Sequence, residues 1–387
     1  MRYQITNVQI VLPDRVIPEG VCCFTDGVID YVGTQPQPDA HTLLRGNGQW
    51  LLPGFVDIHC HGGDGLDFMD ATPEQMEQIA RFHLAHGTTT LLATTMTHRW
   101  PALYEVLDRF GQLVDSGRLL TLHGVHLEGP WLNPAQCGAQ DVQRMELPDP
   151  DRLQELLARY PFIERVSAAP ELPGGLDLGT QGQQSGLVMS VAHTDADFDT
   201  ILQAADRGYT LVTHLYSGMS LTHREHAYRI AGGVEGALYD DRLFVELIAD
   251  GKHLPISLLK LVCKCKGTDR VCLVTDAMRA AGMSDGTLTR LGALADGLDV
   301  LVEDGVAKVP DRTGFAGSVA TTDRLLRVMH RDAGFPLSQV SQMLSTVPAQ
   351  VMGYEDRGSI HLGKRADFVL LNSDLQVESV ILEGNLS

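Results

Sequence analysis

Short apolar runs alternate with helix-like stretches through most of this 387-residue chain, starting near residue 54. This alternation is typical of βα units, whose strands pair in parallel and are covered by helices. Eight such runs can be counted, at residues 55–59, 89–94, 120–128, 163–168, 187–193, 210–214, 243–249 and 271–276. Eight units predict an α/β fold with a (β/α)8 TIM-type barrel, which takes about 250 residues and leaves room for an accessory domain.

Helices are expected between these strands, for example over 73–86, 102–115, 196–207 and 255–263. Several of these segments begin with Pro, Asp or Thr, which favour the first turn of a helix. The segment 285–312 is rich in Gly and Asp. We expect it to form a hairpin or a loop insertion after the eighth strand.

The two ends of the chain share a different pattern. Short β-like runs at 4–11, 21–24 and 28–32 are separated by Asp-Gly and Pro turns, and 368–371 and 377–382 are similar. We therefore expect a small β-sandwich domain that both termini build, from residues 1–52 and 356–387. The barrel domain then covers residues 53–355.

Composition excludes several classes of partner. The chain has 49 acidic against 30 basic residues and a net charge of -19, which argues against binding nucleic acid or an anionic membrane. No apolar run approaches the roughly 20 residues that span a bilayer. The first residues alternate like a strand and lack the features of a signal peptide, so we expect a cytoplasmic protein. Its seven cysteines show no Cys-x2-Cys pair and are expected to be reduced thiols.

Polar side chains stand where the expected strands end. Since the active sites of barrels lie at the carboxyl ends of their strands, these residues are candidates for one site. Any one of them could be a capping group or a buried, satisfied residue, but their joint placement at one rim argues against that. The candidates are His59 and His61 on the first strand, Glu128 on the third, His193 on the fifth, His214 on the sixth and Asp276 on the eighth.

Imidazole and carboxylate groups are ligands that suit zinc and iron. His59 and His61 lie two residues apart on a strand, so they face the same side, while Cys60 faces the other side as a packing residue. Two metal ions would need a bridging carboxylate, and the fourth strand ends in Ala168-Ala169-Pro170-Glu171 without a lysine, so Glu128 is the better candidate. A metal lowers the pKa of its bound water from about 16 to about 7. Asp276 would then be the general base that passes the proton to the leaving nitrogen.

Motifs along the whole barrel resemble the N-acetylglucosamine-6-phosphate deacetylases of the amidohydrolase superfamily. The resemblance implies that Glu128, His193 and His214 hold the principal metal and that Asp276 is the catalytic acid/base. It also implies a second metal at His59 and His61, because only some members keep the His-x-His pair. The matching motifs run from Pro53 to His61, from His126 to Asn133, from Ala169 to Glu171, from His193 to Ala196, from Thr213 to Tyr216, from Ala249 to His253, from Leu273 to Ala277 and from Ala316 to Ser318.

The chain departs from the family pattern where the resemblance places the substrate. Ser217 and Gly218 replace an Asn-Ala pair near the phosphate site, and Arg224, the match to the phosphate-binding arginine, is one residue closer to His214 than usual. In the family's Gly-x-His motif the chain has Gly138, Ala139 and Gln140. Gln140 is thus expected to donate its amide N–H to the developing oxyanion. Further substrate contacts implied by the resemblance are His253, Phe315, Ala316 and Gly317.

Together these features predict hydrolysis of the N-acetyl group of N-acetylglucosamine 6-phosphate to glucosamine 6-phosphate and acetate, by metal-bound hydroxide. Another N-acyl amino sugar, such as N-acetylgalactosamine 6-phosphate or an unphosphorylated sugar, is an alternative substrate. A catalytically silent binding protein on the same barrel is a further alternative. Zinc is the expected metal, as one or two ions per subunit, with iron, cobalt and manganese also open. The resemblance suggests a homodimer in which Arg224 serves the neighbouring active site.

Overall fold

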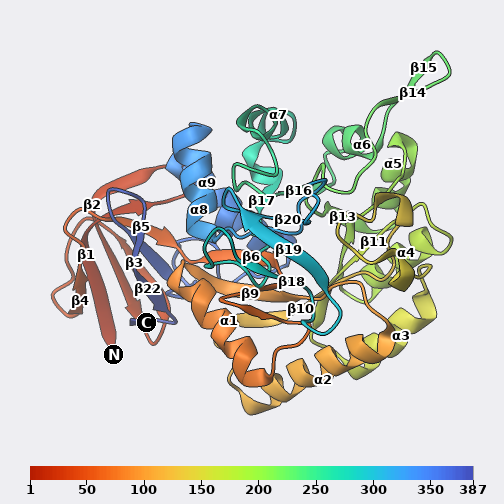
Figure 1. Ribbon diagram of the computed structural model, residues 1–387. Helices are drawn as coiled ribbons and strands as arrows, with labels where there is room; N and C mark the ends of the chain where they lie inside the picture. Colours follow the sequence, from red (N-terminus) through yellow and green to blue (C-terminus); the bar gives the residue numbers. More distant parts are fainter. Residues whose placement is uncertain (387) are drawn as a thin grey trace.

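The computed structural model describes residues 1–386 and has a parallel eight-stranded barrel at its centre (Figure 1). All eight predicted barrel strands are present, and their order in the sheet follows the chain. Their inward and outward faces are both buried, as expected for strands covered by helices. They are β6 (Phe55–Cys60), β9 (Thr88–Thr94), β10 (Leu122–Glu128), β11 (Ile163–Ala168), β12 (Val188–Val191), β13 (Tyr209–Val212), β16 (Phe244–Leu247) and β17 (Val271–Leu273).

The first and last strands meet just beyond the end of β17. The backbone N–H of Asp276 donates to the carbonyl of His59 at 2.9 Å, and Cys60 forms a parallel bridge with Ala277. Thr275 also donates its hydroxyl hydrogen to a carboxylate oxygen of Asp57, at 2.5 Å. The barrel is therefore closed by the same short segments that carry the predicted site residues.

Helices cover the barrel and confirm the predicted βα alternation. α1 starts where the sequence favours it, since Thr72 accepts from the N–H of Gln75 while the side chain of Gln75 accepts from the N–H of Thr72, with Pro73 at the first position. The helices are α1 (Pro73–Ala85), α2 (Trp100–Ser116), α3 (Pro150–Arg159), α4 (Gly175–Gln184), α5 (Phe198–Asp206), α6 (Gly233–Tyr239), α7 (Ile256–Lys266), α8 (Thr322–Arg327), α9 (Leu337–Ser341) and α10 (Val347–Val351).

Two predicted helices are longer than expected, α2 at both ends and α7 at its carboxyl end. α7 was expected to end near residue 263 but continues to Lys266, because lysine is a good helix former and the chain turns only at Gly267, whose φ is 79°. The π-helical turns Val328–Asp332 and Gln342–Thr346 continue α8 and α9. The 3₁₀ turns Pro134–Gln136, Val142–Arg144 and Thr268–Arg270 complete the helical elements.

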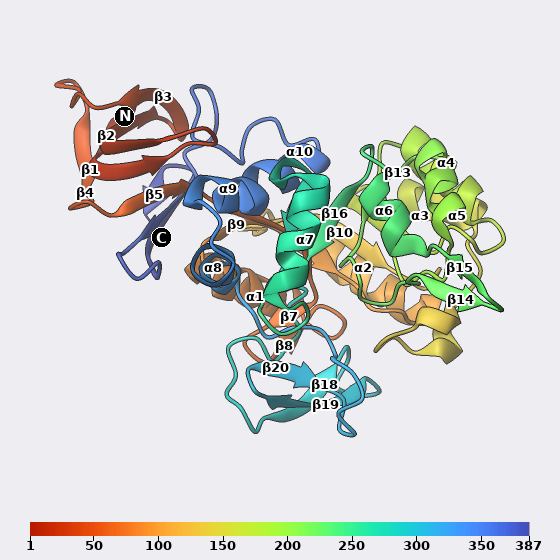
Figure 2. The ribbon, with the colours of Figure 1, turned by 90° about the horizontal axis from the view of Figure 1, so that it is seen from above.

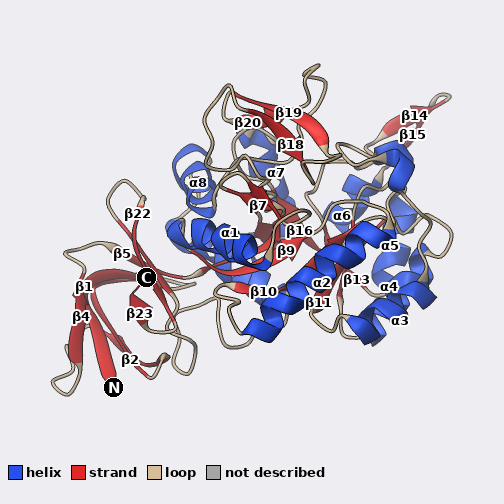
Figure 3. Cartoon of the chain, turned by 60° about the horizontal axis from the view of Figure 1, so that its bottom comes forward, coloured by secondary structure: helices blue, strands red, loops and turns tan. Residues whose placement is uncertain are grey.

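Both termini build one small domain beside the barrel, as predicted (Figure 3). Its strands belong to one hydrogen-bonded sheet that encloses a core with Ile5, Ile10, Phe24 and Phe368. β21 pairs antiparallel with β5, so the end of the chain completes a sheet that its beginning starts. The strands are β1 (Arg2–Val11), β2 (Val16–Thr25), β3 (Val28–Gly33), β4 (His41–Arg45), β5 (Trp50–Pro53), β21 (Phe368–Leu371), β22 (Val377–Leu382) and β23 (Asn385–Leu386).

Two insertions extend from the barrel loops (Figure 2). The predicted hairpin or loop after the eighth strand is a three-stranded antiparallel sheet of β18 (Leu288–Leu291), β19 (Leu298–Glu303) and β20 (Val306–Lys308). A hairpin of β14 (His223–Glu225) and β15 (Tyr228–Ile230) projects from the loop after β13. A short pair, β7 (Gly62–Gly63) and β8 (Leu66–Asp67), follows β6.

We find no helix within residues 1–386 that is both long and apolar enough to cross a membrane.

Candidate metal centre

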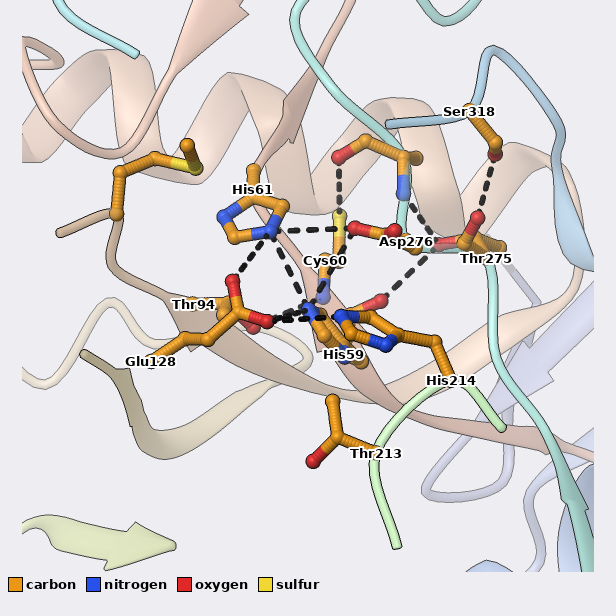
Figure 4. Close-up of polar contacts among 12 residues, drawn as sticks. His59, Cys60, His61, Thr94, Glu128, Thr213, His214, Thr275, Asp276 and Ser318 are labelled. Atoms are coloured by element: carbon orange, nitrogen blue, oxygen red, sulfur yellow. Dashed lines mark hydrogen bonds and ion pairs between the residues drawn. The ribbon is translucent and has the colours of Figure 1, made fainter. Parts of the chain in front are cut away.

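The polar residues predicted at the strand ends come together at one rim of the barrel. Figure 4 shows His59, His61, Glu128, His214 and Asp276 of this cluster. His59 lies near the end of β6, His61 follows that strand, and Glu128 is the last residue of β10. The other three lie just past β12, β13 and β17, and all have a left-handed backbone, with φ of 42° at His193, 27° at His214 and 46° at Asp276. Non-glycine residues rarely adopt this region, and such strain is concentrated at functional sites.

Glu128 occupies the middle of the cluster. Its Oε1 lies 3.1 Å from Nε2 of His214, 3.6 Å from Nε2 of His193 and 3.6 Å from Nε2 of His59. Its Oε2 lies 3.4 Å from Nε2 of His61. A single carboxylate therefore faces four imidazoles with both of its oxygens.

The ligand atoms divide into two groups, each compact enough for one cation. Glu128, His193 and His214 form the first group, and His59, His61 and Asp276 form the second. In the second group, Oδ1 of Asp276 lies 3.2 Å from Nε2 of His61 and 3.5 Å from Nε2 of His59. Because Glu128 contacts both groups, its two oxygens could bridge two metal ions.

Hydrogen bonds on the far side of two imidazoles orient them toward the cluster. Nδ1–H of His193 donates to the carbonyl of Gln136 at 2.8 Å, and Nδ1–H of His59 donates to Oε2 of Glu246 at 3.3 Å. Fixing Nδ1 as the donor leaves Nε2 free as a ligand, which is the usual arrangement around protein-bound metals. The donor set and its orientation therefore fit a divalent cation such as zinc.

A buried ion pair beneath the centre was missed by sequence reasoning. Arg165 in β11 and Glu246 in β16 are both inaccessible to solvent and pair across the barrel interior. Arg165 also donates to the carbonyl of Ile58 at 3.0 Å, and Glu246 accepts from the N–H of His214 at 3.2 Å. The signal in the sequence was a charged residue at a buried position of each strand, Arg165 in β11 and Glu246 in β16.

The electrostatics of the cluster favour positive charge between its carboxylates. Burial opposes protonation of His59, but Asp276 and Glu128 outweigh it and raise the pKa of His59 to about 9. Burial likewise opposes charge on His61, yet hydrogen bonds to Asp276 and Glu128 raise its pKa to about 10. Against their own burial, the neighbouring histidines hold the pKa of Asp276 at about 2 and that of Glu128 well below its usual range. A bound divalent cation would neutralise the same carboxylates in place of the protons on the histidines.

Gln140 lies against the central carboxylate. Its Nε2 donates to Oε2 of Glu128 at 2.8 Å, and its Oε1 accepts from the N–H of Thr97 at 2.8 Å. The side chain is nearly buried. Gln140 therefore holds Glu128 in place, a contact that the sequence did not predict, while its role toward an oxyanion stays a prediction.

A cavity of about 390 Å³ opens from the cluster to the barrel mouth. His253 lines it with its ring fixed, because Nδ1–H donates to Oδ2 of Asp250 at 2.9 Å and the ring packs on Phe315 with centroids 4.9 Å apart. Asp250 belongs to the predicted motif from Ala249 to His253, but the sequence assigned no role to its side chain. The predicted residues that line the cavity are His61, Glu128, His193, His214, Asp276, Ala139, Gln140, Ser217, Gly218, His253, Phe315 and Gly317.

Three predicted site residues, His59, Ala316 and Arg224, do not line the cavity, and His59 is fully buried within the metal cluster. Ala316 is buried behind the cavity wall, where its N–H donates to the carbonyl of Ala307 at 3.0 Å. Arg224 is exposed on the projecting hairpin and does not line the cavity of its own chain. Cys60 points away from the histidines, as its position in the strand predicted, and its Sγ lies 3.2 Å from Nε2 of His83 in α1.

Known proteins match this chain over its full length. The model of the amidohydrolase family matches residues 50–386. The N-acetylglucosamine-6-phosphate deacetylase of Bacillus subtilis is 32% identical, over 99% of this chain and 96% of its own. The N-acetylgalactosamine-6-phosphate deacetylase of Escherichia coli O157:H7 is also 32% identical, over 94% of this chain and 93% of its own.

Solved structures agree with the sequence relatives. A mutant of the Mycobacterium smegmatis N-acetyl-D-glucosamine-6-phosphate deacetylase, in complex with N-acetyl-D-glucosamine-6-phosphate, superposes with a TM-score of 0.91 at 32% identity, covering 100% of this chain and 99% of that one. The Thermotoga maritima N-acetylglucosamine-6-phosphate deacetylase gives a TM-score of 0.85 at 30% identity, with 99% of each chain covered. By sequence, fold and the residues at its barrel rim, the chain belongs to the amidohydrolase family, among the N-acetylglucosamine-6-phosphate deacetylases.

Proposed function

We propose that this protein hydrolyses the N-acetyl amide of N-acetylglucosamine 6-phosphate and releases glucosamine 6-phosphate and acetate. The observation that carries the proposal is the position of Asp276, whose Oδ1 lies 3.2 Å from Nε2 of His61 at the edge of a buried cluster of histidines around Glu128. The names of the Bacillus subtilis relative and of the Mycobacterium smegmatis structure support the same reaction.

Glu128, His193 and His214 would hold the principal cation, and His59 and His61 a second one, with zinc as the preferred metal. When bound, a divalent cation supplies a Lewis acid for the acetyl carbonyl and makes water acidic enough to react at neutral pH. Asp276 accepts the proton of the attacking water and delivers it to the leaving nitrogen.

The sugar is proposed to bind along the wall of the cavity that His253, Ser217 and Gly218 line. His253 has its Nδ1–H engaged by Asp250, so Nε2 is available to accept from a sugar hydroxyl. Ser217 and Gly218 line the cavity near His193 and would lie beside the phosphate end. Gln140 faces the carbonyl end, where an amide N–H can stabilise negative charge.

Arg224 supports a homodimer. It lies on an exposed hairpin and does not line the cavity of its own chain, so we propose that it contacts a substrate phosphate bound in a neighbouring subunit. An arginine suits this task because its planar guanidinium forms paired hydrogen bonds with phosphate oxygens.

A second candidate substrate is N-acetylgalactosamine 6-phosphate. The Escherichia coli O157:H7 relative named for that activity is as similar in identity as the Bacillus subtilis one. The changed residues Ser217 and Gly218 line the same cavity, so the chain departs from the family pattern within reach of a bound sugar.

One comparison of rates tests the proposal. The zinc-loaded protein is assayed with N-acetylglucosamine and N-acetylgalactosamine, each with and without a 6-phosphate, by measuring released acetate. We expect the highest kcat/KM with N-acetylglucosamine 6-phosphate. A higher value with another sugar would reassign the substrate, and no release from any of them would favour a non-catalytic binding protein.

We also propose that the reaction takes place in the cytoplasm. All seven cysteines are free thiols, including the buried Cys22, Cys60 and Cys272, as expected in a reducing compartment. Cell fractionation with an antibody against the protein tests this location, and recovery in an extracytoplasmic fraction would contradict it.

A further inference from the structure

A second cavity opens beside the catalytic cavity and is larger, at about 680 Å³. It lies between the loop 137–144 and the three-stranded insertion β18–β20, and we refer to it as the side chamber. The two cavities share wall residues, among them Met96, Ala139, Gln140, Leu291 and Val309. These shared residues place the side chamber directly beside the catalytic cavity.

The order of the barrel strands determines which end of a substrate faces the side chamber. In the closed sheet, β9 and β10 lie opposite β13 and β16. Met96 follows β9 and Gln140 holds the end of β10, whereas Ser217 follows β13 and His253 follows β16. When the sugar occupies the side of Ser217 and His253, the acyl carbon of the amide points toward Met96 and Gln140.

The near wall of the side chamber is apolar. Met69, Met96 and Leu291 are each less than a tenth exposed and present thioether and aliphatic groups to the chamber. Most of the charged groups in the lining are paired with one another, since Asp296 lies 2.8 Å from Nη2 of Arg144 and 3.0 Å from Nε2 of His98, and Asp141 lies 2.8 Å from Nε of Arg144. Asp311 also lines the chamber and accepts a hydrogen bond from Thr313. A flexible, uncharged chain matches this lining better than a second sugar or a phosphate.

We infer that the side chamber binds the acyl chain of the substrate, and that the protein hydrolyses amino-sugar phosphates whose N-acyl chain is longer than acetyl. This inference rests on the proposed function. The reaction remains a simple amide hydrolysis: the oxygen of water bonds to the acyl carbon, the carbon–nitrogen bond breaks, and the nitrogen takes up a proton. The products are the longer carboxylate and glucosamine 6-phosphate.

The test compares acyl chains of increasing length on one sugar. The zinc-loaded protein is assayed with the N-acetyl, N-butyryl and N-hexanoyl derivatives of glucosamine 6-phosphate, by measuring the free amine. We expect kcat/KM for the longer chains to lie within about tenfold of the acetyl value, because each methylene enters apolar space. If the pocket ended behind the acetyl methyl group, kcat/KM would instead fall roughly 10- to 200-fold for each added methylene.

Two variants in the same turn test whether the side chamber determines the preference for acyl-chain length. Ala293 lines the side chamber but not the catalytic cavity, and Ala293→Trp would fill it. Ala295 lies two residues away, is exposed and does not line the chamber, so Ala295→Trp is the matched control. We expect Ala293→Trp to lower the ratio of hexanoyl to acetyl kcat/KM at least tenfold and Ala295→Trp to leave that ratio unchanged.

The outcomes separate the inference from the proposed function. Acetyl turnover combined with a loss above 100-fold for butyryl would overturn the inference and leave the proposed function standing. Turnover of the longer chains without acetyl turnover would overturn the proposed acetyl specificity and support the side chamber. An equal effect of both tryptophan variants on the ratio would also overturn the inference.

Discussion

The side-chain amide of Gln140 donates a hydrogen bond of 2.8 Å to Oε2 of Glu128, the carboxylate that faces all four imidazoles of the centre. The amide is itself fixed, because its oxygen accepts from the N–H of Thr97. One neutral side chain therefore sets the position of a carboxylate that contacts both candidate metal groups.

Replacing this amide should weaken the centre. We expect Gln140→Ala to lower metal affinity on the order of 10- to 100-fold, as is typical when the hydrogen-bond partner of a metal ligand is lost. Titration with a competing chelator measures this. Gln136→Ala is the control, because only the backbone carbonyl of Gln136 contacts His193. If Gln140→Ala binds metal normally but loses kcat about 10²- to 10³-fold, its role is that of an oxyanion donor instead.

Asp276 should be needed for turnover but not for the principal metal. We expect Asp276→Asn to lower kcat by about 10²- to 10⁴-fold, the range that a general acid/base contributes. Elemental analysis should find the cation at Glu128, His193 and His214 retained. A variant with undiminished kcat would exclude Asp276 as the proton carrier.

The paired histidines should control metal stoichiometry. We expect two metal ions per chain in the native protein and one in His59→Asn and His61→Asn, since Glu128, His193 and His214 remain as a complete group. His98→Asn, which changes a histidine at the rim, should keep the native value. A single ion per chain in the native protein would contradict the two-metal arrangement.

Arg224 should act on phosphorylated substrates only. We expect Arg224→Ala to raise KM for N-acetylglucosamine 6-phosphate at least tenfold and to leave the unphosphorylated sugar unaffected, because the lost group is a phosphate ligand. Arg229 faces Arg224 across the hairpin, so Arg229→Ala is a matched control. Mixed dimers of Arg224→Ala and Asp276→Asn chains should regain activity if the arginine acts across the interface. Failure to regain it would place Arg224 outside the partner's site.

His83 should make stability depend on pH. Burial lowers the pKa of His83 to about 4, although Nε2–H donates to the carbonyl of Gly62 at 3.0 Å. The unfolded chain takes up this proton near pH 6.5, so the stabilisation is complete above pH 6.5 and is lost as pH falls through 4. The loss amounts to about 3 kcal/mol.

Urea unfolding at pH 7 and pH 4.5, with chelator present to remove metal effects, measures this dependence. The free energy of unfolding of His83→Asn should differ less between the two pH values than that of the native protein. The variant lacks the imidazole whose proton uptake differs between the folded and unfolded states. A substitution of the exposed His226 should leave the difference unchanged. An equal pH dependence in His83→Asn and the native protein would contradict the assignment.

The barrel strands, the helices and the polar residues at the strand ends could be predicted, because each depends on the order of apolar and polar residues within a short segment. The run before His59 is apolar except for the buried Asp57, and the polar residue that ends each run lies where the strand meets the loop. The pairing of Arg165 with Glu246 could not be predicted in this way, since it joins two strands on opposite parts of the barrel. The contact of Gln140 with Glu128 depends on a turn in which the N–H of Gln140 donates to the carbonyl of Cys137, a detail of backbone path. Likewise, the sequence placed Arg224 near the phosphate but could not show that its hairpin projects away.

The pairing of β5 with β21 has a consequence for how the chain is made. During synthesis β1 to β5 leave the ribosome before any barrel strand, but their sheet stays incomplete until the last residues emerge. The edge of β5 that later pairs with Phe368 is thus open while the whole barrel is translated, and open strand edges recruit other chains. Closing a loop of this length also slows folding. Nascent chains stalled before residue 368 should therefore depend on chaperones more than released ones do.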